Sequence, residues 1–152
     1  MVYPVLKWIH VLMAIVAIGS NATYGIWIAR ASRKPEALPF TLRGIKLIDD
    51  RFANPAYGML LITGFLMVFQ AMPLLTAPWL QTALVLYGAL VLLGLLGYTP
   101  TLKKQIQLLE SQGPASPEYQ AVARRGTALG ILTILLAITI VFLMVVKPSM
   151  WA

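Results

Sequence analysis

The segment from Lys7 to Arg30, KWIHVLMAIVAIGSNATYGIWIAR, is the feature that most restricts how this chain can fold. About twenty residues between Trp8 and Trp27 carry no formal charge unless His10 is protonated, and at a rise of about 1.5 Å per residue they span roughly 30 Å. That length matches the hydrocarbon core of a bilayer, and tryptophan is common at both of its interfaces. We therefore expect this segment to cross a membrane as one helix.

The composition of the whole chain supports a membrane fold. Of the 152 residues, 59% are hydrophobic and 11% are charged, and the mean hydropathy is +0.80; a soluble domain has roughly 25% charged residues. Three further apolar segments follow the first. We predict an all-α protein with a single domain, residues 1–152, in which four spanning helices form a bundle, at about 5–30, 55–72, 78–98 and 122–147.

Pairs of a capping residue and a proline indicate where helices begin. Asn54–Pro55, Thr99–Pro100 and Ser116–Pro117 each have the form of an N-cap followed by the first helical residue. The second pair leaves two possibilities open for residues 101–112, a separate helix or a kinked extension of the third span into water. Gly113, followed by proline, is expected to end that segment.

Residues 40–52 form an amphipathic pattern. Leu42, Ile45, Ile48 and Phe52 recur at helical spacing, and we expect the charged residues to fall on other faces: Arg43, Lys46, Asp49 and Asp50. Such a helix is too short and too charged to span a membrane. It is expected to lie along the headgroup boundary, and the alternative is a solvated connecting helix.

Basic residues indicate the orientation of the bundle. Only Lys7 and Lys147 lie on one side of the predicted spans, and all other lysines and arginines lie in the two large connections on the opposite side. The positive-inside rule predicts a multi-pass membrane protein with both large connections in the cytoplasm and both termini outside. Anionic lipid headgroups are the expected partners of the basic connections, and nucleic acid is not. The first helix lacks a signal-peptide cleavage pattern and is expected to be retained.

One stripe of the first helix is polar or small throughout: Lys7, His10, Ala14, Ala17, Asn21 and Tyr24. We expect this stripe to face other helices, because lipid-facing positions are normally large and aliphatic. Asn21 should find a hydrogen-bond partner in another helix, since an unpaired amide is costly in a bilayer. Gly126 and Gly130 in the last helix have the spacing for close helix packing, within the chain or across a homodimer.

The alternation of the helices brings several polar side chains to the level of His10 near the outer surface. We predict a candidate polar cluster there: Lys7, His10, Asn21, Gln70 and Gln81. His10 then either fixes the bundle through a hydrogen bond to Gln70, Gln81 or a backbone carbonyl, or serves as a ligand. The chain has no cysteine, which excludes disulfides and thiolate metal sites, and we predict neither a catalytic residue nor a protein metal cluster.

Several segments resemble one bacterial family over nearly the whole chain. They are LKWIHVLMAIVAIG, DDRFANP, the pair Gly58 and Gly64, and LMVVKP, and they are similar to predicted integral membrane proteins labelled domain of unknown function 2269. More distantly, the K-x-x-H pattern of Lys7 and His10 resembles the first helix of copper-resistance protein D domains and of HemJ-type membrane proteins. The latter resemblance implies a small helical bundle that binds haem, although this chain has no second histidine.

Three functions remain open at this stage. The first is a non-enzymatic accessory or structural membrane subunit in which His10 is structural. The second is a membrane protein that binds haem b or a metal with His10 as axial ligand. The second ligand would be a methionine, a water or the His10 of a homodimer partner. The candidate methionines are Met67 and Met144, and Met72 is a further candidate if the metal is copper(I). The third is a small transporter, disfavoured because no carboxylate or arginine is expected within the membrane part of any span.

Overall fold

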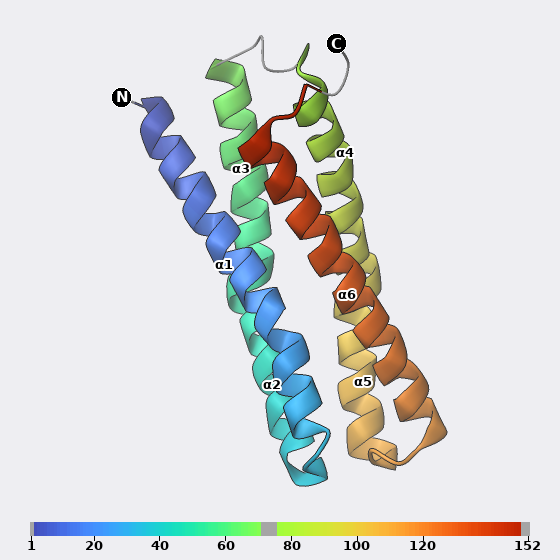
Figure 1. Cartoon of the computed structure of the whole chain (residues 1–152). Coiled ribbons are helices and arrows are strands. Elements are labelled where there is room, and N and C mark those ends of the chain that lie inside the picture. The colour runs from blue at the N-terminus through green and yellow to red at the C-terminus, as the bar shows by residue number, and fades with distance from the viewer. Residues whose placement is uncertain (1, 71–75, 150–152) are drawn as a thin grey trace.

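The computed structural model describes residues 2–70 and 76–149, and every regular element in this part of the chain is helical (Figure 1). The elements are α1 (Val2–Ala31), the 3₁₀ turn η1 (Pro35–Ala37), α2 (Leu38–Ile48), the π-helical segment η2 (Asp49–Ala53), α3 (Asn54–Gln70), α4 (Pro78–Leu92), the π-helical segment η4 (Leu93–Tyr98), α5 (Thr99–Gln112) and α6 (Pro117–Val146). The predicted all-α four-helix bundle is confirmed.

Consecutive elements join into four long helices, each apolar enough to cross a membrane: Val2–Ala31, Pro35–Gln70, Pro78–Gln112 and Pro117–Val146. The second and third contain 36 and 35 residues, so each is about 50 Å long, which exceeds a hydrocarbon core of about 30 Å. The excess length is α2 and α5, which lie at the end of the bundle that carries the α1–α2 and α5–α6 connections (Figure 1). We call this the basic end and the opposite one, where α1 begins and α6 ends, the terminal end.

Asn54–Pro55 does not begin a separate helix, and at Thr99–Pro100 the second of the two open possibilities holds, an extension of the third long helix. The chain runs as one helix through Asn54–Pro55 and through Thr99–Pro100. A proline inside a helix lacks its N–H and crowds the carbonyl four residues earlier. Each of these prolines lies two residues after the end of a π-helical segment, whose wider turn relieves that crowding. Ser116 does cap α6, accepting a hydrogen bond from the Tyr119 N–H at 3.1 Å, and Gly113 ends α5 with a φ of 81°.

The amphipathic prediction for residues 40–52 is right about the helix and wrong about its faces. Leu42 and Ile45 are buried, but Ile48 and Phe52 are exposed, and Asp49 is only 4% exposed. At about 100° per residue Asp49 falls between Leu42 and Ile45 on the helical wheel, so the buried arc includes it. The apolar face packs against α1 and α5 and the helix continues into α3, so α2 is part of the bundle instead of a separate helix lying along the headgroups.

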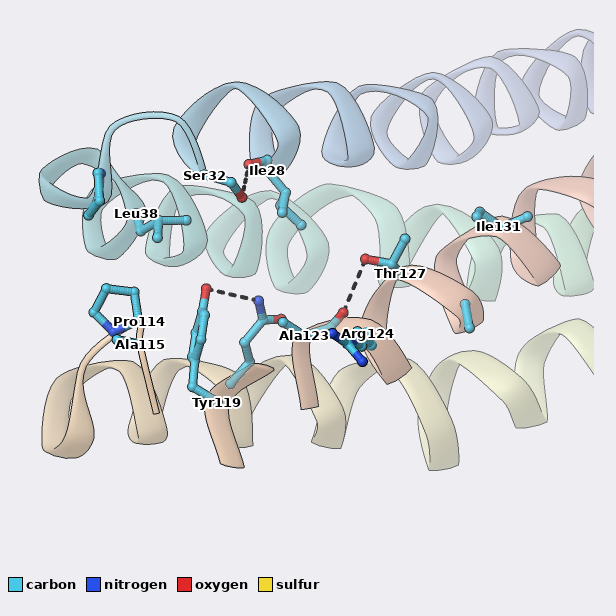
Figure 2. Close-up of a pocket in the computed structure, with 13 residues that line it drawn as sticks. Ile28, Ser32, Leu38, Pro114, Ala115, Tyr119, Ala123, Arg124, Thr127 and Ile131 are labelled. Carbon is cyan, nitrogen blue, oxygen red and sulfur yellow. Dashed lines mark hydrogen bonds between the residues drawn. The ribbon is translucent and has the colours of Figure 1, made fainter. Parts of the chain in front are cut away.

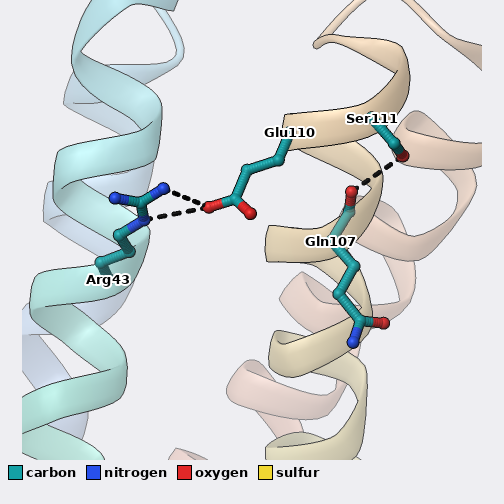
Figure 3. A network of polar contacts seen from close by, with 4 residues as sticks. All are labelled: Arg43, Gln107, Glu110 and Ser111. Carbon is teal, nitrogen blue, oxygen red and sulfur yellow. Dashed lines mark hydrogen bonds and ion pairs between the residues drawn. The ribbon is translucent and has the colours of Figure 1, made fainter.

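The bundle is built from two halves. α1 packs against α3, and α6 packs against α4 and α5, while α2 meets α5 at the basic end. A cluster of buried side chains fills the space there and draws on both halves: Tyr24, Ala31, Leu38, Leu42, Ile45, Leu102, Leu109 and Tyr119. The Arg43 guanidinium also donates from α2 to the Glu110 carboxylate on α5, with Nε 3.0 Å from Oε1 (Figure 3). Both side chains are largely exposed, so burial at the basic end, more than this ion pair, joins the halves.

Small residues on α1 allow the close approach of α3. Ala17 is fully buried against Ala56 and Leu60, and Ala14 packs beside this cluster. The amide of Asn21 donates to the Tyr57 hydroxyl of α3 at 2.6 Å and to the Ala17 carbonyl at 3.1 Å. The expected partner for Asn21 in another helix is therefore present.

Candidate functional site

A cavity of about 460 Å³ lies between the two halves, toward the basic end. All four long helices contribute to its walls, which are mainly apolar. Twelve of the lining residues are polar, and they come from every long helix: Asn21, Tyr24, Ser32, Asp49, Asn54, Tyr57, Tyr87, Tyr98, Thr99, Gln105, Thr127 and Thr133. A partly enclosed, mainly apolar space with convergent polar groups is the usual form of a small-molecule site in a helical bundle.

Asp49 is the only charged residue among those that line the cavity. Its Oδ2 accepts hydrogen bonds from Asn54 Nδ2 at 3.2 Å and from Thr99 Oγ1 at 3.3 Å, so it ties the π-helical segment of one half to the start of α5 in the other. Lys46, one turn earlier, forms its ion pair with Asp50 instead. Among the described residues Asp49 therefore has hydrogen-bond donors but no cationic partner.

Four of the six tyrosines line this cavity. The rings of Tyr24 and Tyr98 stack across the two halves, with centroids 6.4 Å apart and planes within 10°. Tyr57 accepts from Asn21, and the Tyr87 hydroxyl donates to the Tyr57 carbonyl. Tyr24 is different: its side chain is 97% buried, and its hydroxyl has no hydrogen-bond partner.

Glycines make the room for the cavity. Gly25, Gly58 and Gly94 line it, and a Cβ atom added at any of them would meet no other atom within 4 Å. Gly126 is tighter, because an added Cβ would lie 3.4 Å from Gln105 Oε1, and at Gly130 it would lie 3.7 Å from the Tyr98 ring. The Gly126–Gly130 pair thus faces α5 and η4 of the same chain.

A groove of about 650 Å³ adjoins the cavity at the basic end (Figure 2). Figure 2 shows Ile28 and Ser32 of α1 on one side and Tyr119 and Thr127 of α6 on the other. The groove and the cavity share part of their lining, namely Ile28, Ser32, Gln105, Ala123, Thr127 and Ile131. The groove and the cavity are therefore neighbours, separated by these shared side chains.

The predicted polar cluster near the terminal end is not assembled as one unit. His10 bonds to Thr63, whereas Asn21 lies three helical turns away at the cavity. Lys7, Gln70 and Gln81 are exposed. Lys147 lies over the Trp79 ring, with Nζ 5.5 Å from its centroid. The partner of His10 is thus neither of the two glutamines.

The contacts of His10 define which of its nitrogens is protonated. Its Nδ1 lies 2.8 Å from Thr63 Oγ1, and the Thr63 hydroxyl donates a hydrogen bond to the Met59 carbonyl at 2.7 Å. Because that proton is already donated, Thr63 accepts from His10, and the neutral imidazole carries its proton on Nδ1. Nε2 keeps its lone pair. An added Cβ at Gly64 would lie 3.4 Å from His10 Cε1, so this glycine gives the ring its space.

The candidate methionine ligands lie on different helices. Met67 is one turn beyond Thr63 on α3, and Met144 is near the end of α6. Met72 falls outside the described residues. Within residues 2–70 and 76–149, no group of three His, Asp or Glu side chains is arranged to hold a metal ion.

A family model described as "predicted integral membrane protein (DUF2269)" matches residues 4–148. The chain belongs to this family. No curated protein and no solved structure matches it. The resemblance to the domain of unknown function 2269 is thereby confirmed, while the more distant likeness to copper-resistance protein D and HemJ-type proteins is not shown.

For this family member, sequence reasoning missed the carboxylate that matters most to the cavity. Asp49 lies just before the second predicted span, in the same continuous helix, and is only 4% exposed. Its place on the wheel between Leu42 and Ile45 was a usable signal. No signal in the sequence indicates that Tyr57, Tyr87 and Tyr98 converge, because their convergence depends on how four helices are arranged.

Proposed function

We propose that this member of the family is a non-enzymatic, multi-pass membrane protein that binds a small organic molecule in the cavity between its two halves. The observation that carries the proposal is the Tyr24 hydroxyl, which is buried beside the cavity with no hydrogen-bond partner. A buried polar group without a partner costs roughly 1–3 kcal/mol. A ligand that accepts or donates a hydrogen bond there recovers that cost. The volume of about 460 Å³ also lies within the usual range for ligand sites.

A cavity-filling substitution tests this function with a neutral probe. 3,3-Dimethylbutan-1-ol has a compact apolar body and one hydroxyl, and it is expected to raise the thermal midpoint of the protein in mild detergent. Gly94→Leu should abolish this response, because Gly94 lines the cavity and its position has open space for a side chain.

The matched control is Gly88→Leu on the same long helix, at an exposed glycine that does not line the cavity. It should keep the full response to the alcohol. A response that is absent from the wild type, or equal in all three proteins, would refute the proposed function.

We further propose that the bundle lies in the bacterial inner membrane with its basic end in the cytoplasm and both termini outside. This orientation is supported by the positive-inside rule and by the basic connections, whose expected lipid partners are anionic headgroups. Reporter fusions at Ala37 and Ser111 should report the cytoplasm, and a fusion at the C-terminus should report the outside. A cytoplasmic C-terminus would contradict this orientation.

A second function, binding of haem b through His10, is favoured by one observation. Since Thr63 takes the Nδ1 proton, Nε2 is free to serve as an axial ligand, and a hydrogen bond on the other ring nitrogen is the common arrangement for ligating histidines. Haem would supply a redox-active iron. The chain offers one histidine, so the other axial position would fall to Met67, Met144, a water or the His10 of a second copy.

Haem binding has a direct spectroscopic test. Protein purified from cells supplied with a haem precursor should show a Soret band, and His10→Ala should remove or shift it. The control is Thr63→Val, which keeps the ligand but frees its Nδ1, and which should shift the band without abolishing it. Absence of any band in the wild type would eliminate this function.

A further inference from the structure

The charges around the cavity point to the class of ligand that it binds. Asp49 is its only charged lining residue, and no lysine, arginine or histidine lines it. Placing a carboxylate in an apolar site without a cation is costly. Among the described residues, the cation that could have paired with it, Lys46, is committed to Asp50. The cavity therefore presents an acidic group that forms no ion pair within the described part of the chain.

Aromatic rings surround this acidic group. Tyr24, Tyr57, Tyr87 and Tyr98 line the same space, and the Tyr24–Tyr98 stack spans the two halves. The faces of aromatic rings attract cations, most effectively where water is excluded, and rings of this kind recognise quaternary ammonium groups. A carboxylate together with several tyrosines is a combination that suits a positively charged organic group.

We propose that the cavity binds an organic cation, a quaternary or protonated amine with a compact apolar body, held by Asp49 and the four tyrosines. This inference rests on the proposed ligand-binding function and names its substrate class. Among the described residues no group of three His, Asp or Glu side chains is arranged to hold a metal ion, which favours an organic cation over an inorganic one.

Choline and 3,3-dimethylbutan-1-ol test the inference as a pair, since they have the same shape and differ in the positive charge. Titrations that follow the thermal midpoint of the wild type should give choline the higher apparent affinity, by about tenfold or more. Asp49→Asn should bring the two affinities to within about twofold of each other while the alcohol still binds, since asparagine keeps the shape and loses the charge.

The outcomes separate this inference from the proposed function. If the alcohol binds and choline binds no better, the cavity is a ligand site but not a cation site. If neither compound binds, the proposed function fails as well. A preference for choline that survives in Asp49→Asn would overturn the role of Asp49.

Reaction rates at a cysteine give a second measurement that does not depend on the stability of Asp49→Asn. The chain has no native cysteine, so Gly94→Cys places a single thiol in the cavity. A trimethylammonium methanethiosulfonate should react there at least about ten times faster than a sulfonate of similar size, relative to their rates at Ser111→Cys, an exposed position of the same long helix outside the predicted spans. Equal relative rates would contradict the inference.

Discussion

Replacing Ala17 by leucine is expected to lower the thermal midpoint of the purified protein by several degrees. Ala17 is fully buried where α1 meets α3, in contact with Ala56 and Leu60, so a larger side chain has no free space. Overpacking of this kind costs about 1–3 kcal/mol, and for a chain of this size each kcal/mol lowers the midpoint by about 2–4 °C. The two helices would have to separate to admit the extra atoms.

Ala89→Leu is the matched control, because it makes the same change at an exposed position on α4. Its midpoint should stay close to that of the wild type, since a leucine that faces lipid or detergent disturbs no packing. The comparison uses thermal unfolding of both variants in one detergent at one scan rate. If Ala17→Leu were as stable as Ala89→Leu, the close packing of α1 on α3 would be refuted.

Replacing Asp49 by asparagine is expected to raise the thermal midpoint of the ligand-free protein, in contrast to the lower midpoint of Ala17→Leu. The carboxyl group is buried without a cationic partner, whereas an asparagine can accept the same hydrogen bonds from Asn54 and Thr99 and carries no charge. The gain should be about 1–3 kcal/mol in free energy of unfolding. Such a gain would fit the trade-off between stability and function that is common at binding sites.

Asp50→Asn provides the comparison for this prediction. Asp50 is exposed and pairs with Lys46, so its replacement should change the free energy of unfolding by no more than about 0.5 kcal/mol. The measurement is the thermal midpoint without added ligand. A marked loss of stability in Asp49→Asn would mean that the charge of Asp49 is compensated in the ligand-free protein, and would argue against an acidic site open to a cation.

The fold was largely predictable because bilayer thickness restricts each apolar segment to one form, a helix of about twenty residues or more. The four helices, the start of α6 at Ser116 and the end of α5 at Gly113 all follow from local sequence. The predicted helix start at Pro55 failed because a π-helical turn lets a helix pass through a proline. At Pro100 the sequence left a new helix and an extension of the third span both open, since no local pattern distinguishes the two.

The candidate site was much less predictable. The sequence indicates His10, the only histidine, as a candidate site residue, but the hydrogen bond between His10 and Thr63 depends on which face of α3 meets α1. The cavity depends on contacts between residues even farther apart in the sequence, since Tyr24 and Tyr98 are stacked across the two halves. Such pairings come from the arrangement of helices in three dimensions, which the spacing of residues within one helix does not determine.

The two π-helical segments have a consequence for other members of the family. A π-turn holds one residue more than an α-turn, and such turns arise in α-helices as local insertions near functional sites. Asp49 begins the first segment and Tyr98 ends the second, so both line the cavity from the places where the helical pitch changes. A relative that is one residue shorter in either segment should form an ordinary helix there and turn its cavity residues away. Single-residue gaps at 49–53 or 93–98 in an alignment would thus separate members that share this site from those that share only the fold.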